Sequence, residues 1–595
     1  MTGILQALAL YNERLFAEGA VQPPGFQEKE IPWVIELDAH GAFIALRRTG
    51  GEDGRGRKFV VPAEVKKSVN IAANLLWGNA EYVLSQPRPD RKEEQAAKVP
   101  KRHEAFLARL RELPAEARAD PGVAAVIAFL KKGDFTALQS AEGWAELVRG
   151  GANVSFRLEG DDGLVCERTN VRAAVSTFAE KQADDMPEAW CLVTGRRARP
   201  ARLHPSIKGV RGAQPSGASL VSFNLDAFAS HGWSQGENAP VSTAAAHAYS
   251  TALNHLLSRD NARQRLVEGD TTFVFWAAAK SPIEDQFSHL LGSYGTGEQE
   301  SDGASVRATF DSVRRGLRPS LDDATPFYVL GLAPNAARLA VRLWHEGTVA
   351  ALARNILKHF DDLEIVGLSG QSDAPGLWRL IGAAARGGDA RRFSDTLRGQ
   401  LAAGVMAAVL DGLPYPSALL PRAVARCRAE QSVWPLRAAL IKAVLNRRFP
   451  TKEITVSLDS DESDPGYRLG RLFAILENIQ RTQGDTNVTI RDRYFGAFMA
   501  APRSVFPQLM RLKNAHLKKL YRDPEKRGLA IFFERQIDEI LDTLHPAEGV
   551  PASLSLEEQG RFILGYHHQR NHRSGIRTED DATGPTDLSK LQPAE

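Results

Sequence analysis

The side chains of this chain that are best suited to bind a ligand by charge lie in residues 196–211. This stretch contains His204, no Asp or Glu, and six cationic residues: Arg196, Arg197, Arg199, Arg202, Lys208 and Arg211. Because no acid neutralises them nearby in the sequence, these cations attract an anionic partner, most commonly a polyphosphate backbone. The stretch therefore indicates nucleic-acid binding. A basic loop that only faces solvent is the alternative.

Glycine and proline residues around these cations predict a loop rather than a helix. Short apolar runs at 192–193 and 220–223 flank the stretch, and we expect each run to form a strand. Backbone rich in Gly and Pro can approach a phosphate chain closely. Gln214 and Ser216 follow the last arginine and add polar reach.

A second group of candidate residues lies in residues 63–76, where the pattern predicts a helix. Its polar side chains recur at helical spacing and fall on or near one face: Lys66, Lys67, Asn70 and Asn74. Lysine neutralises phosphate, and asparagine makes paired hydrogen bonds to adenine edges. An ordinary exposed helix face fits the same residues.

A third group lies on a helix that we expect at 504–521. Arg511, Lys518 and Arg522 are spaced at i, i+7 and i+11, and Lys513 and Lys519 lie close by. Eight Lys and Arg residues stand between positions 503 and 527, against two acids. Such a stripe can hold the backbone of a single strand without reading its sequence. A basic face that docks a protein is the alternative.

Catalytic and metal-binding patterns are weak throughout the chain. His568 and His572 are four residues apart beside His567, but the HExxH pattern and a third ligand are missing. Residues 51–58 lack the GK[ST] ending of a phosphate-binding loop, and no G-x-S-x-G occurs. The three cysteines, Cys166, Cys191 and Cys427, fit neither a zinc spacing nor a disulfide framework. We expect no catalytic centre, metal site or cofactor.

Composition places the chain among ordinary globular proteins of the reducing cytoplasm. Its 595 residues are 43% apolar and 25% charged, with a net charge of only +3. Overall charge therefore gives no sign of nucleic-acid binding, and only local patches can. We expect residues 3–18 to form an amphipathic helix rather than a signal peptide, and we expect no transmembrane span.

The periodicity predicts a multidomain α+β fold, with a mixed α/β N-terminal half and a C-terminal helical bundle. We expect a hairpin over 31–47, a helix over 242–257, a strand over 271–276 and helices from residue 338 onward, the first over 338–360. Trp233 is expected in the core, and a wedge that enters a groove is the alternative. The expected regions are 1–225, mixed α/β; 226–335, α+β; 336–455, helical; 456–573, a helical bundle; and 574–595, a disordered tail.

Seven segments together resemble one family. They are WVIELDAHG at 33–41, VNIAANLLWGNAEYVL at 69–84, ARLHPSIKGVRGAQPSGASLVSFN at 201–224, GENAPVSTAAAHAYSTALNHLL at 236–257, DTTFVFWA at 270–277, GYRLGRLFAILENIQ at 466–480 and GYHHQR at 565–570. The chain resembles, over nearly its whole length, the large subunit of the type I-C CRISPR–Cas surveillance complex Cascade, the c subtype of the Cas-eight family.

This resemblance implies a role in antiviral defence without catalysis. Family members join a complex of Cascade backbone subunits and guide crRNA, and recognise the protospacer-adjacent motif in double-stranded DNA. They help open the duplex into an R-loop, steady the displaced strand and recruit a separate helicase-nuclease. On the side of the adjacent motif, the residues would be Lys66, Lys67, Asn70, Asn74, Arg202, Lys208, Arg211 and Gln214. For the displaced strand they would be Arg511, Lys513, Lys518, Lys519 and Arg522.

The resemblance also implies that the small subunit of the complex can arise by internal translation of the same gene. A translation start near Val456 would produce the bundle that we expect at 456–573 as a separate protein. Two other functions stay open. The chain could be a metal-dependent nuclease that uses His567, His568 and His572, or a scaffold that binds protein subunits without reading DNA.

Overall fold

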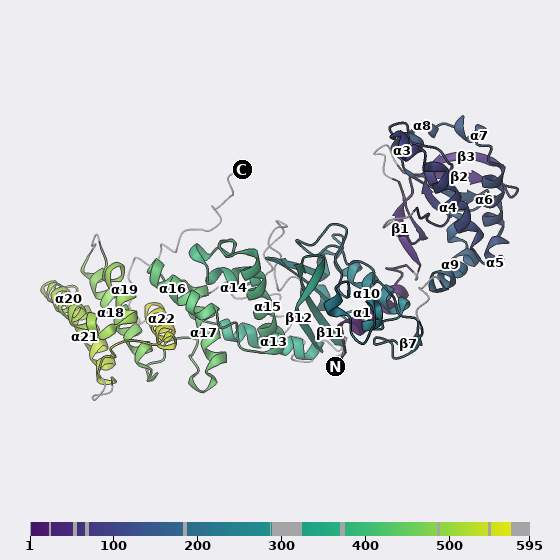
Figure 1. Ribbon diagram of the computed structural model, residues 1–595. Helices are drawn as coiled ribbons and strands as arrows, with labels where there is room; N and C mark the ends of the chain where they lie inside the picture. Colours follow the sequence, from purple (N-terminus) through teal and green to yellow (C-terminus); the bar gives the residue numbers. More distant parts are fainter. Residues whose placement is uncertain are drawn as a thin grey trace. The chain divides into compact units, whose positions relative to one another are not determined.

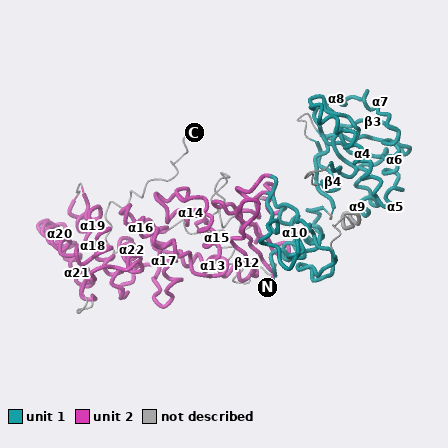
Figure 2. Tube along the Cα trace, in the orientation of Figure 1, with its two compact units in different colours: residues 1–208, 216–255 teal, residues 209–215, 256–595 magenta. Residues whose placement is uncertain are grey.

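The computed structural model describes residues 2–22, 25–50, 56–65, 71–181, 187–281, 283–285, 287, 324–368, 375–484, 488–544 and 549–572 (Figure 1). The chain divides into two compact units, residues 1–208 with 216–255 and residues 209–215 with 256–595 (Figure 2). Both units combine helices with small sheets, and the helices dominate toward the C-terminus. The α+β multidomain fold predicted from the sequence is confirmed.

The first unit contains a four-stranded sheet of order β3-β2-β6-β5. Strands β2 (Trp33–Leu37) and β3 (Phe43–Arg48) form the predicted hairpin, while β6 (Asn153–Leu158) runs parallel to β2 and antiparallel to β5 (Trp77–Asn79). The carboxylate of Asp38 closes the hairpin by accepting hydrogen bonds from the backbone N–H groups of His40 and Ala42. The turn is fixed by its own side chain, which is why the sequence shows it clearly.

Helices cover this sheet, and a separate ribbon of two strands lies beside it. The ribbon pairs β1 (Phe26–Glu30) with β4 (Lys58–Pro62). The helices are α2 (Ala80–Val83), α3 (Glu93–Ala96), α4 (Val99–Arg111), α5 (Ala115–Arg118), α6 (Pro121–Lys132), α7 (Thr136–Gln139), α8 (Trp144–Gly150) and α9 (Thr169–Lys181).

The helix predicted at 63–76 is wrong over residues 71–76, which lie in a loop that leads into β5. Leu75, Leu76 and Trp77 are buried in succession, and Leu76 has φ +63°, a left-handed conformation that an α-helix cannot contain. The indole N–H of Trp77 donates a hydrogen bond to the carbonyl of Pro62 at 2.8 Å. Burial of an apolar run from all sides overrode the helical pattern.

The rest of the first unit contains α1 (Ile4–Ala17), α10 (Thr243–Leu256) and a short ribbon of β7 (Ala189–Trp190) with β8 (Arg197–Ala198). Both helices match the sequence predictions. Ser242 begins α10 as predicted, since its hydroxyl accepts a hydrogen bond from the backbone N–H of Ala245 at 3.3 Å.

The second unit begins with an antiparallel sheet of order β12-β11-β10-β9. Its strands are β9 (Arg265–Glu268), β10 (Thr271–Ala277), β11 (Pro326–Asn335) and β12 (Arg338–Thr348). The helix predicted to begin at residue 338 is therefore wrong for its first half, which forms β12. Trp276, Tyr328 and Trp344 pack their rings against one another from three adjacent strands, at 5.3–5.9 Å between centroids. Pairing with β11 and these cross-strand ring contacts select the strand.

The remainder of the second unit is helical. Helix α14 (Leu377–Ala383) was not predicted, whereas the others agree with the sequence pattern: α13 (Val349–Leu363), α15 (Asp395–Asp411), α16 (Leu419–Glu430), α17 (Pro435–Arg448), α18 (Pro465–Gln483), α19 (Ile490–Ala500), α20 (Pro502–Arg522), α21 (Arg527–Asp542) and α22 (Leu556–Asn571). One hydrophobic core extends from Leu266 on β9 to Tyr566 on α22. Gly560 of α22 packs against Ile441 and Leu445 of α17, so this core continues across residues 450–466.

Helices α18 and α22 approach each other closely enough for their backbones to touch. Glycines make this possible, because a Cβ at Gly466 or Gly470 would overlap a backbone carbonyl of α22, and a Cβ at Gly565 would overlap the carbonyl of Tyr467. Two buried hydrogen bonds reinforce the pair. The Tyr566 hydroxyl donates to the carboxylate of Glu477 at 2.5 Å, and the Tyr467 hydroxyl lies 2.9 Å from Nδ1 of His568.

We expect Gly470→Ala to destabilise the second unit by roughly 1–3 kcal/mol, because the added methyl collides with the Phe562 carbonyl. The matched control is Gly528→Ala on α21, where a Cβ meets nothing within 4 Å and the helix gains about 1 kcal/mol of propensity. Thermal unfolding followed by circular dichroism tests this pair. A melting temperature of Gly470→Ala at or above that of Gly528→Ala would contradict the close packing.

Candidate nucleic-acid interface

The basic stretch at 196–211 begins inside the short ribbon of β7 and β8. Trp190 pairs with Arg197 in the antiparallel register, and residues 192–195 form the turn between the strands. The strands predicted at 192–193 and 220–223 are therefore wrong, since the first run lies in this turn and the second in irregular loop. Gly195, at φ +65°, adopts the left-handed conformation in this turn, and two residue pairs form the ribbon.

After β8 the chain is held against the entrance to α10. Pro200 and Ser242 form an isolated antiparallel bridge, and the N–H of Ala201 donates to the carbonyl of Val241 at 2.8 Å. Leu192, in the turn, donates to the carbonyl of Pro240 at 2.9 Å. These bonds use the backbone alone, so the intervening side chains are left for other contacts.

The cations of this stretch point into solvent. All six of its Arg and Lys residues are exposed. Among the residues that the structure describes, no acid forms an ion pair with Arg196, Arg197, Arg199, Lys208 or Arg211. An uncompensated group of cations on a structured loop has the electrostatics of an anion-binding surface.

His204 does not share this exposure. Its Nδ1 lies 2.7 Å from the hydroxyl of Tyr249 on α10, and burial lowers its pKa to about 4. The imidazole is therefore neutral near pH 7 and adds no charge to the surface. Its contribution is to hold the stretch against α10.

Lys208, Arg211 and Gln214 follow where the chain passes from the first unit into residues 209–215 of the second. In the first unit, the N–H of Lys208 donates to Oδ1 of Asn254 at 2.8 Å. In the second, the N–H of Arg211 donates to the hydroxyl of Thr272 on β10 at 3.1 Å. All three side chains are exposed while the backbone around them is fixed by hydrogen bonds.

The second predicted group is placed only in part. Lys66, Lys67 and Asn70 lie outside the described residues. Asn74 is buried, with 6% of its surface exposed, and its Oδ1 accepts a hydrogen bond from the N–H of Val65 at 3.1 Å. In this structure, Asn74 stabilises the loop before β5.

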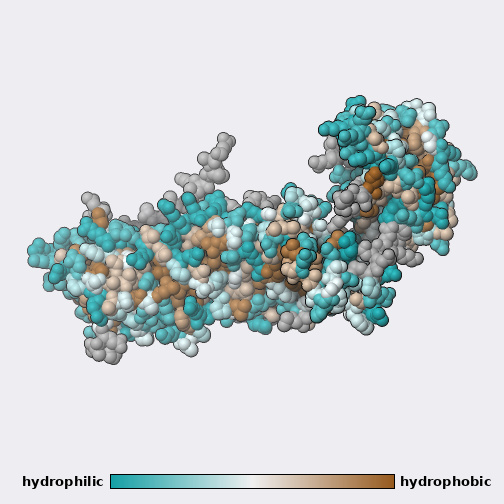
Figure 3. All heavy atoms as spheres, in the orientation of Figure 1, coloured by the Kyte–Doolittle hydropathy of each residue, from teal (hydrophilic) through white to brown (hydrophobic). Residues whose placement is uncertain are grey.

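Helix α20 has the amphipathic form that its sequence predicts. Leu509, Leu517 and Leu520 are buried, and Pro507 lies inside the helix. The opposite face exposes Arg511, Lys518, Lys519 and Arg522, whereas Lys513 is half-buried on the side of the leucines. In the described part of the chain, no acid pairs with these five cations. Figure 3 shows hydrophilic side chains gathered where this helix lies.

Exposed aromatic side chains beside the basic stretch were not found from the sequence. Trp190 is 66% exposed and Trp233 is 49% exposed, so the prediction that Trp233 belongs to the core is wrong. Trp233 stands in GWSQGENAP, which holds no other large apolar residue to pack with it. That isolation in the sequence was the available signal.

The histidines considered as metal ligands belong mainly to the core. Nε2 of His567 lies 2.8 Å from the carbonyl of Val366, and His568 is fully buried against Tyr467. Burial lowers their pKa values to about 4 and about 3 respectively. Within the described ranges, no three His, Cys, Asp or Glu side chains gather closely enough to hold a metal ion.

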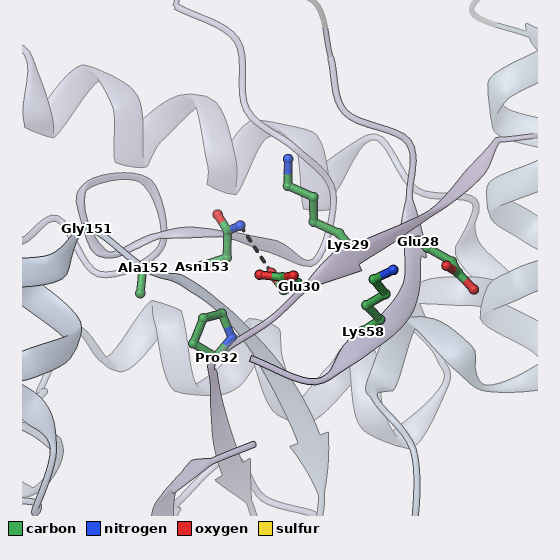
Figure 4. Close-up of a pocket in the computed structure, with 8 residues that line it drawn as sticks. All are labelled: Glu28, Lys29, Glu30, Pro32, Lys58, Gly151, Ala152 and Asn153. Carbon is green, nitrogen blue, oxygen red and sulfur yellow. Dashed lines mark hydrogen bonds between the residues drawn. The ribbon is translucent and has the colours of Figure 1, made fainter. Parts of the chain in front are cut away.

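A pocket of about 480 Å³ lies in the first unit between β1, β4 and the turn before β6 (Figure 4). Its lining combines Lys29 and Lys58 with Glu28 and Glu30, and Nδ2 of Asn153 donates to the carbonyl of Glu30 at 3.3 Å. The described lining contains no Ser, Cys or His.

The two units define a multidomain α+β protein that presents exposed cations on a fixed loop and on one helix face. A model of the family described as CRISPR-associated protein (Cas_Csd1) matches residues 8–574. The chain belongs to this family, and it is the large subunit of a type I-C CRISPR system. The resemblance seen in the sequence is thereby confirmed. A search of curated proteins finds no match. Every helix in the described residues is too short or too polar to cross a bilayer.

Burial of His568 generates a prediction for pH. Desolvation, with His567 and Lys442 nearby, lowers its pKa from 6.5 to about 3, so the folded protein keeps the imidazole neutral. The unfolded chain binds a proton below about pH 6.5. The contribution of the neutral imidazole to the free energy of unfolding is therefore complete above that pH. Acidification to about pH 5 lowers this free energy by on the order of 1–2 kcal/mol.

We therefore expect the melting temperature of His568→Gln, which carries no titrating group there, to fall less than that of the wild type between pH 7 and pH 5. His40→Gln, at an exposed position, serves as the control and should fall as the wild type does. Equal falls for His568→Gln and wild type would show that this imidazole does not couple folding to pH.

Proposed function

We propose that this chain is the non-catalytic subunit that recognises the protospacer-adjacent motif in double-stranded DNA within a crRNA-guided Cascade complex. It would help open the duplex into an R-loop, steady the displaced strand and recruit a separate helicase-nuclease. One observation carries the proposal: exposed cations without described acidic partners stand on a loop whose backbone is held by hydrogen bonds.

The loop residues have the chemistry for reading a short duplex motif. Arg211 can make paired hydrogen bonds to guanine, Gln214 can do so to adenine, and Lys208 can bind guanine or phosphate. Arg202 lies upstream on the same segment, and its carbonyl accepts a hydrogen bond from the N–H of Gly236 at 3.2 Å. Base pairing with the guide would read the rest of the target, as in other RNA-guided systems. The parts proposed for Lys66, Lys67, Asn70 and Asn74 and the internal start near Val456 stay predictions.

Helix α20 supports the proposed contact with the displaced strand. Its exposed cations follow one face over three turns, from Arg511 to Arg522. A row of cations binds a phosphate backbone irrespective of base sequence, which is what a displaced strand of any target requires.

We expect Lys208→Ala with Arg211→Ala to weaken binding of the assembled complex to target duplexes. Loss of two phosphate or base contacts should also lower the slope of log affinity against log salt by up to about 2. Mobility shifts would use guide-matched duplexes with a randomised flank, with the chain, without it and with each variant. The wild-type complex should enrich a short flank motif.

The matched control is Arg111→Ala with Arg391→Ala, which removes the same charge from exposed arginines already paired with Glu104 and Asp389. Equal weakening of DNA binding by both double variants would show that the loop contributes only through the net charge of the protein. Enrichment of no flank by the wild type, or full binding without the chain, would favour the scaffold function instead.

We expect Arg511→Ala with Lys518→Ala to expose the displaced strand while leaving flank selection intact, because these cations are proposed to act after recognition. Permanganate reactivity of unpaired thymines in the displaced strand should rise severalfold. Arg535→Ala with Arg391→Ala is the control, since both arginines are exposed and paired with acids. Unchanged reactivity in the α20 variant would remove this face from the path of the strand.

A further inference from the structure

Two exposed tryptophans lie on either side of the arginines of the basic stretch. Trp190 on β7 stands directly opposite Arg197 on β8, and residues so paired in an antiparallel ribbon project from the same face. Both side chains are exposed. An indole two-thirds exposed next to a guanidinium forms a flat apolar surface beside a positive charge.

Trp233 is brought to the same segment by a loop of fixed structure. The N–H of Gly236 donates to the carbonyl of Arg202, and a Cβ at position 236 would overlap the carbonyl of Ala201. Asn238 stabilises the loop from within, since its Nδ2 donates to the carbonyls of Trp233 and Gln235. The loop that carries the exposed indole of Trp233 is therefore fixed at Gly236 against residues 201–202.

Exposed indoles and arginines on one structured segment are typical of proteins that bind single-stranded nucleic acid. Such proteins bind the phosphates with cations and stack unpaired bases on aromatic rings. A duplex offers no base faces for stacking, so the tryptophans select unpaired bases. Arg196, Arg197 and Arg199 lie between the two indoles in the chain, and no described acid pairs with them.

We propose that Trp190 and Trp233 stack unpaired bases of single-stranded DNA whose backbone lies along Arg196–Arg202. This proposal rests on the proposed function, because the segment continues directly into Lys208, Arg211 and Gln214, where the duplex would be read. Bases unpaired next to that duplex are then the first that the tryptophans meet. The surface would take the strand where the duplex opens.

The test measures binding of the full-length chain to a fluorescent oligothymidylate by anisotropy. Trp190→Leu and Trp233→Leu keep an apolar side chain but remove the aromatic face, and each should weaken binding about tenfold. Trp190→Phe and Trp233→Phe keep a ring and should retain most of the affinity. The salt dependence should stay unchanged in all four variants, because no charge is lost, whereas Arg197→Ala should lower it.

Phe16→Leu provides the matched control, since Phe16 is 53% exposed on α1 of the same unit. It should bind as the wild type does. Wild-type affinity in both tryptophan-to-leucine variants, or no binding of oligothymidylate by the wild type, would overturn the proposal. Loss of Cascade subunits from a pull-down with the leucine variants, at unchanged DNA affinity, would assign the surface to protein docking.

Two further measurements separate this proposal from the one on which it rests. The first compares binding of an oligouridylate of equal length. If the wild type binds it more tightly than the oligothymidylate, and the leucine variants lose this difference in affinity, the surface belongs to guide RNA and the DNA assignment is overturned. Flank enrichment by the assembled complex should persist in the leucine variants. If the wild-type complex enriches no flank motif while the tryptophan variants still weaken binding to oligothymidylate, only the proposed motif recognition is contradicted.

Discussion

The contact between α18 and α22 is the constraint on which the second unit depends. Gly466, Gly470 and Gly565 remove the side chains that would hold the helices apart, so backbone meets backbone. Packing at this distance leaves no free volume, because an interior at crystal-like density cannot accommodate one additional methyl group. The outer face of α22 then packs on α16 and α17 through Gly560, so the same helix joins the last helices to the core that begins at β9.

The candidate interface follows a different rule, since main-chain N–H groups supply much of its order and no described acid forms an ion pair with Arg197, Lys208 or Arg211. Hydrogen bonds from Lys208, Arg211 and Ala201 use main-chain N–H groups, while the cations extend into solvent. A charged side chain bound to a neighbour would have to break that contact before it bound DNA. Fixing the loop through its backbone removes that cost and limits the entropy lost when a ligand orders the side chains.

Local signals in the sequence predicted the elements that local interactions stabilise. The hairpin at 31–47 and the helices at 242–257 and 504–521 are present in the structure. The Asp38 turn, the Ser242 hydroxyl and the buried leucines of α20 each act within a few residues. Residues 71–76 and 338–348 were misassigned because their conformation depends on distant partners, the first on burial around Trp77 and the second on pairing with β11. The basic stretch was visible from composition. The exposed state of Trp190 and Trp233 depends on the ribbon and on the loop at 230–238, neither of which has a strong sequence signal.

The division of the chain into units has a consequence for its synthesis. Residues 209–215 belong to the second unit although residues 216–255 return to the first. Their hydrogen bonds reach Thr272 and Arg265, which leave the ribosome 61 and 56 residues later. During translation, the segment that carries Arg211 and Gln214 must therefore wait for β9 and β10 before it has partners. The basic loop is completed only when the second unit begins to fold, so a truncated product ending before residue 265 would carry the arginines without the framework that positions the last of them.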